Sequence, residues 1–200
     1  MFALVESGSI TQMLGGNQGI QIGDLKYPKA IYTLWTEAER NAIGIYTVEY
    51  DDSNRKDEQW YINTNQSYAF ADNKVTATYG TATAKSHADT LWIAEDEDNE
   101  LGTEGEVATR GLKYNLIQTV KAQAANELAK TDWYITRKSE KNTAIPSAIT
   151  THRDAVRSKQ AAMETAITNA SDTPALETLY TFTKQDDGSV TRPLGELPTL

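Results

Sequence analysis

The chain has 200 residues, 39% of them hydrophobic and 24% charged, which fits a globular protein of one large or two modest domains. The absence of cysteine excludes disulfides, thiolate metal sites and cysteine nucleophiles. A formal net charge of −9 argues against nucleic-acid and anionic-membrane partners, because those partners are bound by clustered Lys and Arg.

The amino-terminal sequence does not resemble a targeting segment. Residues 1–10 have no basic region of the kind that starts a signal peptide, and no apolar run in the chain approaches the ~20 residues that span a bilayer. We therefore expect a protein that is synthesised in the cytoplasm and that, if it leaves, does so without a signal peptide.

Residues 1–86 have the pattern of a small antiparallel β-rich head. Alternation around a turn at Gly8 predicts a first hairpin. Thr36 and Glu39 have capping-box spacing and Gly44 fits a C-terminal cap, which predicts one short helix over residues 37–43. A meander follows, with a tight turn at Asp72-Asn73 and strands rich in β-branched and aromatic residues over 45–50, 59–64, 67–71 and 74–79.

The head carries several aromatic residues whose role the sequence leaves open. They either pack between strands or form a face that recognises a protein, a sugar or a host receptor. These residues are Trp60, Tyr61, Tyr68, Phe70 and Tyr79.

An acidic segment follows the head. The net charge divides as −3 for residues 1–88, −7 for 89–110 and +1 for 111–200. Like-charge repulsion and the lack of an apolar period predict an extended linker over residues 87–110. The carboxylates of Asp96, Asp98 and Glu100 have the spacing of a calcium loop, but Leu101 stands where such a loop needs glycine, so we expect no metal there.

Residues 111–180 are expected to form a helical hairpin with a short third helix. Apolar residues recur every four positions in the first helix, and every seven in a second helix that begins after Pro146. Thr173-Pro174 predicts the start of the third helix, with Thr173 as its cap, ending by Tyr180. The apolar positions are Leu112, Leu116, Val120, Ala124 and Leu128 in the first helix, and Ile149, Val156, Met163 and Ala170 in the second.

Residues 181–200 contain too few apolar side chains for a core of their own. Asp187-Gly188 predicts a turn in a small two-stranded ribbon. Beyond it, prolines disfavour helix and strand, so we expect an extended arm whose leucines are exposed and dock on a neighbouring protein. These leucines are Leu194, Leu197 and Leu200.

No catalytic, cofactor-binding or metal-binding residue can be assigned. The two histidines, His87 and His152, have no nucleophile motif nearby and are expected at the surface or at an interface. The glycine-rich stretch 15–19 lacks the Gly-Lys-Ser/Thr ending of a phosphate-binding loop. The chain is therefore expected not to be an enzyme.

Two aromatic residues, Trp133 and Tyr134, follow Thr131-Asp132 between the two long helices. A Thr or Asp at this position can cap a short turn. The simplest interpretation is that Trp133 folds back over the seam between the two helices and closes its open end.

The same region resembles the carboxy-terminal helical pattern of tailed-bacteriophage tail-assembly chaperones and tail-fibre assembly proteins. In those families a "DW" at a helix end precedes a loop, a proline and an amphipathic helix with an arginine pair, and residues 1–50 are similar to the β-rich head that often comes before it. Where the family often has Tyr before the first arginine, this chain has His152. The matching residues are Leu128, Thr131, Asp132, Trp133, Ile135, Arg137, Glu140, Pro146, Arg153 and Arg157.

The resemblance implies a non-enzymatic structural or adaptor component of a phage tail, associated with a tail fibre or baseplate and acting by protein–protein docking. It would be made in the host cytoplasm, reside in the virion and serve host attachment without a cofactor. The alternative is a soluble tail-fibre assembly chaperone that leaves before the virion matures. The implied partner is a tail-fibre or neighbouring tail protein, a homo-oligomer stays open, and the partner-binding residues are Trp133, Tyr134, Arg153, Arg157, Leu194, Leu197 and Leu200.

Overall fold

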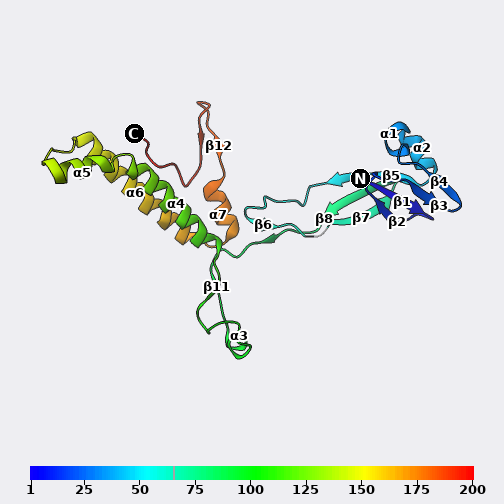
Figure 1. The fold of residues 1–200 in the computed structure, drawn as a ribbon, viewed down its shortest axis with the longest axis horizontal. Helices are drawn as coiled ribbons and strands as arrows, with labels where there is room; N and C mark the ends of the chain where they lie inside the picture. Colours follow the sequence, from blue (N-terminus) through cyan, green and yellow to red (C-terminus); the bar gives the residue numbers. More distant parts are fainter. Residues whose placement is uncertain (65) are drawn as a thin grey trace. The chain divides into compact units, whose positions relative to one another are not determined.

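A computed structural model describes residues 1–64 and 66–200 and divides the chain into two compact units, Met1–Thr83 and Ala84–Leu200. Unit 1 is rich in strands and unit 2 contains the long helices, which confirms the α+β class (Figure 1). The division falls within a few residues of the predicted end of the head.

Unit 1 is built on a five-stranded sheet with the order β2-β1-β5-β8-β7. Three of its neighbouring pairs are antiparallel, but β5 and β8 are parallel, so the expected antiparallel meander is wrong at this pair. After β5 the chain first forms the edge strand β7. It then turns back as β8, which lies between β7 and β5. The strands are β1 (Phe2–Glu6), β2 (Ser9–Leu14), β5 (Ile45–Asp51), β7 (Gln66–Ala71) and β8 (Lys74–Tyr79).

Both predicted tight turns are present. Ser7 and Gly8 join β1 to β2 with φ of 50° and 77°, and Asp72 and Asn73 join β7 to β8 with φ of 50° and 64°. Two consecutive positive φ angles define a type I′ turn, whose twist matches that of the flanking strands. Local turn chemistry therefore determines the register of both hairpins.

The predicted helix is also confirmed. Thr36 and Glu39 form the capping box at the start of α2, and Gly44 has φ of 81° just past its end. A Cβ at Gly44 would lie 2.6 Å from the carbonyl oxygen of Val5, so both the backbone angle and the close approach require glycine. The elements beside the sheet are β3 (Ile20–Ile22), β4 (Leu25–Tyr27), α1 (Ile31–Leu34) and α2 (Glu37–Ala42).

Unit 1 has two small apolar clusters. Two are expected because successive side chains of a strand point to opposite faces of the sheet. One contains Val5, Val48 and Val75, and the other places Leu4 and Ile45 against α1. Trp60 and Tyr61 are buried, while Tyr68 and Phe70 pack partly buried on the first cluster, which favours the packing interpretation of these rings. Short strands β6 (Tyr61–Ile62) and β9 (Thr83–Ala84) complete this part of the chain.

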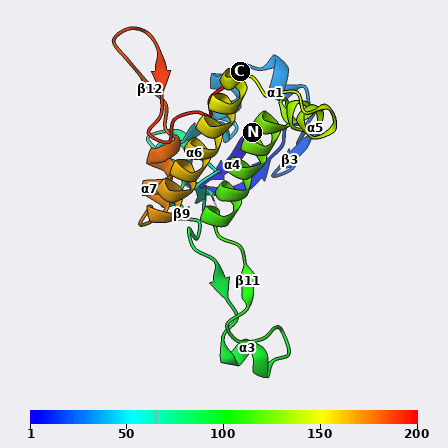
Figure 2. The same ribbon diagram turned by 90° about the vertical axis from the view of Figure 1, so that its left-hand side faces the viewer.

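Unit 2 contains the predicted helical hairpin, with α4 and α6 side by side (Figure 2). Lys113 near the start of α4 donates to the carbonyl of Thr168 at the end of α6, so the two helices are antiparallel. The third helix is capped by Asp172, not Thr173, because the Thr173 hydroxyl donates instead to the Lys85 carbonyl at 2.6 Å. The elements are α4 (Leu112–Ala129), α5 (Asp132–Lys141), α6 (Ser147–Asn169), α7 (Thr173–Tyr180), β12 (Thr183–Lys184) and β13 (Val190–Thr191).

The acidic segment is not an extended linker. It folds back on itself as β10 (Thr90–Leu91), α3 (Ala94–Asp98) and β11 (Val107–Thr109), and it belongs to unit 2 (Figure 1). Trp92 closes the hairpin: its N–H donates to the carbonyl of Glu106 at 2.9 Å, and its carbonyl accepts from the N–H of Gly105 at 3.0 Å. Repulsion among exposed, screened carboxylates is too weak to prevent this backbone pairing.

The base of this acidic hairpin, residues 89–110, is closed independently of its tip. The N–H groups of Leu112 and Lys113 donate to the carbonyls of Ser86 and His87, each at 3.0 Å. Asp89 accepts from the N–H of Gly111 at 2.8 Å and from Arg110 at 2.6 Å. The chain thus enters α4 from residue 88 almost directly, and the hairpin is a protrusion.

We predict that unit 2 folds without the tip of the acidic hairpin. Replacing residues 91–108 by Asn-Gly would join the paired Thr90 and Thr109 through a two-residue turn. Because the base contacts remain, the melting temperature should stay within about 3 °C of the parent value in differential scanning calorimetry. Loss of the cooperative helical transition would contradict this reading of the hairpin.

Candidate functional site

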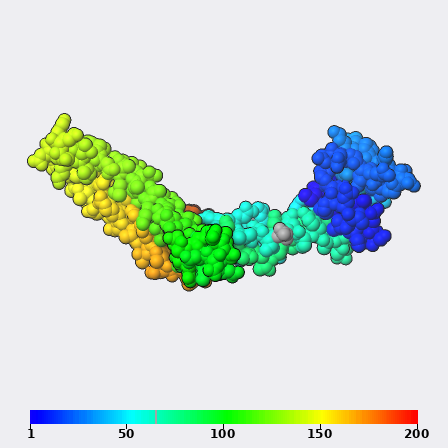
Figure 3. Space-filling view, turned by 60° about the horizontal axis from the view of Figure 1, so that its bottom comes forward, coloured from blue at the N-terminus to red at the C-terminus, as the bar shows by residue number. Residues whose placement is uncertain are grey.

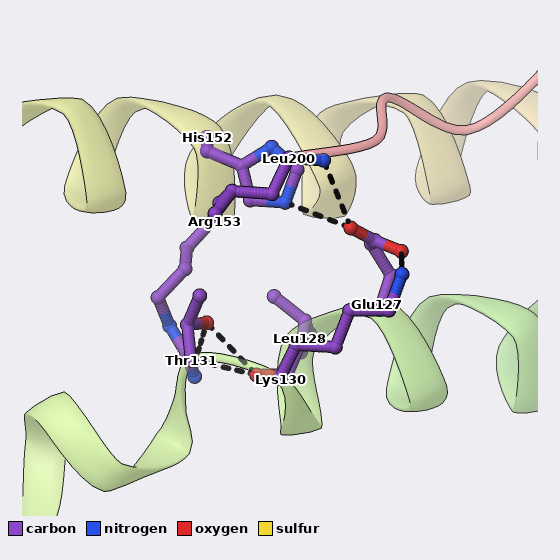
Figure 4. A network of polar contacts seen from close by, with 7 residues as sticks. All are labelled: Glu127, Leu128, Lys130, Thr131, His152, Arg153 and Leu200. Carbon is purple, nitrogen blue, oxygen red and sulfur yellow. Dashed lines mark hydrogen bonds and ion pairs between the residues drawn. The ribbon is translucent and has the colours of Figure 1, made fainter.

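The turn between α4 and α5 is organised around a buried arginine from α6. Arg153, only 8% exposed, donates to the Leu128 carbonyl at 2.8 Å and to the Thr131 hydroxyl at 2.6 Å (Figure 4). It also pairs with Asp132 at 2.8 Å. One guanidinium therefore connects the end of α4, the start of α5 and the first turns of α6.

The location of this arginine follows from the helix geometry. The last carbonyls of α4 have no partner within the helix, and the helix dipole makes that end negative. A cation with several donors satisfies both requirements. Arg153 thus serves as the C-terminal cap of α4, supplied from another helix.

A second polar group lies beside the first. The carboxylate of Glu127 is buried, and it accepts hydrogen bonds from Lys130 and from the backbone N–H of Leu200, the latter at 3.2 Å. The Nε2 atom of His152 lies 3.3 Å from Glu127 Oε1. The hydrogen bond from Lys130, assisted by Leu200 and His152, lowers the pKa of Glu127 against the opposing effect of burial.

The predicted role of Trp133 is wrong. Its side chain is 51% exposed, whereas Thr131 is 1% exposed and fills the place at the end of the hairpin that Trp133 was expected to close. The reason is that α5 begins at Asp132, directly after Thr131, so Trp133 lies on the outward side of a ten-residue helix.

Trp133 instead belongs to a stack on the surface of α5. Its ring centroid lies 3.8 Å from that of Tyr134, and the Arg137 guanidinium carbon is 4.8 Å from the Trp133 centroid and 5.1 Å from the Tyr134 centroid. Such cation–π contacts restrict the conformations of these three side chains. Ile135 is also exposed, but on another side of α5, because residues two positions apart do not share a helix face.

The structure separates the two predicted arginines. Arg153 is buried in the turn, whereas Arg157 is exposed, pairs with Asp154 at 3.1 Å and borders an open groove of about 730 Å³ along α4 and α6. Arg153 therefore positions α5, and only Arg157 is accessible to a partner.

The expected exposure of the arm leucines is wrong for Leu194. It is 3% exposed, its N–H donates to the Leu179 carbonyl at 3.0 Å, and its own carbonyl accepts from Lys159 at 2.8 Å. Leu197 is partly buried and the Leu200 side chain is exposed. The arm thus packs on its own helices (Figure 1), although the predicted ribbon of β12 and β13 is present.

Glu127 and Thr131 were not predicted as part of the site, although the sequence contains a signal for Glu127. It continues the buried stripe of Val120 and Ala124 at helical spacing, and a carboxylate on a core-facing position requires buried partners. Thr131 was expected only as a possible cap of a short turn. It is the N-cap residue of α5 without a side-chain cap hydrogen bond, and its burial depends on Arg153 from a distant part of the chain.

Within residues 1–64 and 66–200, no group of three or more His, Cys, Asp or Glu side chains is placed to hold a metal ion. Among the same residues, no helix combines the length and apolar character that crossing a membrane requires. No family model matches the chain, and no curated protein or solved structure is significantly similar to it.

We predict that Arg153→Met destabilises the protein by about 3 kcal/mol, because the Leu128 carbonyl and the Thr131 hydroxyl lose a buried donor. The matched control is Arg157→Met, which removes only an exposed ion pair and should change stability by at most ~0.5 kcal/mol. Urea unfolding measures both, and equal effects would contradict the role given to Arg153.

We predict that acidification releases the carboxy terminus. Because folding lowers the pKa of Glu127 below its ordinary value, the ionised carboxylate contributes stability at higher pH, and this contribution is lost as pH falls through the lowered pKa. The protection factor of the Leu200 amide in hydrogen exchange, which corrects for the intrinsic pH dependence of exchange, should therefore fall as the pH drops below the ordinary pKa of a glutamate carboxyl. Glu127→Gln should remove this pH dependence, and the exposed Glu140→Gln should retain it.

Proposed function

We propose that the chain is a non-enzymatic structural or adaptor component of a tailed-phage tail, made in the host cytoplasm and incorporated into the virion by docking on a neighbouring tail protein. The resemblance of residues 112–160 to tail-assembly and tail-fibre assembly proteins supports this source. The alternative, a soluble chaperone that leaves the particle, differs in whether the chain is present in mature virions.

The observation that carries the docking role is the exposed stack on α5. The half-exposed ring of Trp133 leaves apolar surface in contact with water, which is unfavourable in the free protein. The stack is also made of Trp, Tyr and Arg, the residues most enriched in binding hot spots. The stack is also ordered in advance by its own cation–π contacts and by the Arg153 turn below it. Pre-ordering reduces the entropy that binding would otherwise lose.

The test uses peptide mass spectrometry of purified virions of the phage that encodes the chain. Wild-type peptides should be present in stoichiometric amounts relative to other tail proteins. Trp133→Ala should reduce incorporation at least ~10-fold, since truncating a hot-spot residue costs about 2 kcal/mol or more. Its melting temperature should stay close to the parent value, because the lost ring is exposed.

The control is Ile62→Ala, which truncates an exposed apolar side chain in unit 1 and should leave incorporation unchanged. Normal incorporation of Trp133→Ala would contradict the docking role of α5. Peptides absent from mature virions but required for tail formation would support the chaperone instead.

A further inference from the structure

Unit 2 carries two exposed surfaces of complementary chemistry. The first, the α5 face, combines aromatic side chains with cations of the same helix. It consists of Trp133, Lys138 and Lys141, which are exposed, and of Tyr134 and Arg137, which are half-buried. The second is the acidic hairpin.

The acidic hairpin is more than a cluster of charge. It carries a net charge of −7 over residues 89–110, and Leu91, Ile93 and Leu101 are each about half exposed or more on it. Exposed apolar side chains among carboxylates form a surface that fits an apolar patch ringed by cations. The α5 face has this composition.

The two surfaces cannot meet within one chain. The acidic hairpin protrudes beside the start of α4, whereas α5 begins just after the end of α4 (Figures 1 and 3). The 18 residues of α4 place these ends about 27 Å apart, at a rise of about 1.5 Å per residue. In two copies arranged head to tail, the acidic hairpin of one copy can reach the α5 face of the other.

We propose that the acidic hairpin of one copy docks on the α5 face of a second copy. Leu91, Ile93 and Leu101 pack on Trp133 and Tyr134, and the carboxylates of α3 face Arg137, Lys138 and Lys141. This inference rests on the proposed docking role of α5 and names its partner as the chain itself. Each copy offers one hairpin and one face, so the contact is heterologous and generates a ring or an open filament.

The experiment measures self-association of the full chain by sedimentation velocity from about 1 µM to about 1 mM, the range of weak interfaces. The wild-type chain should form dimers and larger species, and raising the salt from about 0.05 M to about 0.5 M should weaken them because the charges are exposed. Glu95→Lys/Asp98→Lys in the hairpin and Trp133→Ala/Arg137→Glu on α5 should each be monomeric.

Mixing the two variants separates this contact from others. The hairpin variant retains an intact α5 face and the α5 variant retains an intact hairpin, so an equimolar mixture should form one-to-one dimers and nothing larger. Controls with matched changes of charge are Glu6→Lys/Asp186→Lys for the hairpin and Arg157→Glu for α5, and they should associate like the wild-type chain. Circular dichroism of each variant should match that of the wild-type chain, which checks that the variant is folded.

Two outcomes would overturn the inference. One is a wild-type chain that stays monomeric at low salt over the whole range, and the other is association that neither pair of substitutions weakens. Either result leaves the proposed function intact if Trp133→Ala still blocks incorporation into virions, because the partner of α5 would then be a different tail protein. Normal incorporation of Trp133→Ala would instead remove the proposed function.

Discussion

The buried guanidinium of Arg153 is the interaction on which unit 2 depends. The facing apolar side chains of α4 are small, with Val120 and Ala124 buried at its centre, so the area they bury does little to select one axial register of the two helices. A buried charged group is less tolerant, because a shift by one turn would separate Arg153 from the Leu128 carbonyl and the Thr131 hydroxyl. The arginine therefore favours the observed pairing of α4 and α6.

The Glu127 group adds a second constraint of the same kind. It connects α4 to His152 on α6 and to the last residue of the chain, so the carboxy-terminal arm and the helical hairpin meet at one carboxylate. Leu194 supplies the apolar part of this attachment, and its backbone groups are bonded to Leu179 and Lys159. An arm that is poor in apolar residues thus becomes ordered through polar contacts to its own helices.

Features that depend on interactions between neighbouring residues could be predicted from the sequence, and features that depend on distant residues could not. Thr36 with Glu39, the turn at Ser7-Gly8 and the start of α7 were predictable, because each depends on residues within four positions. The parallel pairing of β5 with β8 and the burial of Thr131 were not, since both depend on residues far away in the chain. The prediction of an extended acidic linker was wrong, because backbone hydrogen bonds at Trp92 close a hairpin that the charge pattern does not indicate.

The exposed position of Trp133 follows from the way the turn between α4 and α5 is built. A buried ring would have closed the hairpin by apolar contact alone, but Thr131 and Arg153 occupy that position and leave the ring to the surface. Because the first turn of α5 is held by a buried ion, its outward side chains start from a rigid backbone. Rigid aromatic anchors lose little entropy on binding, so the polar network inside the turn and the aromatic stack outside it together suit the docking role proposed for α5.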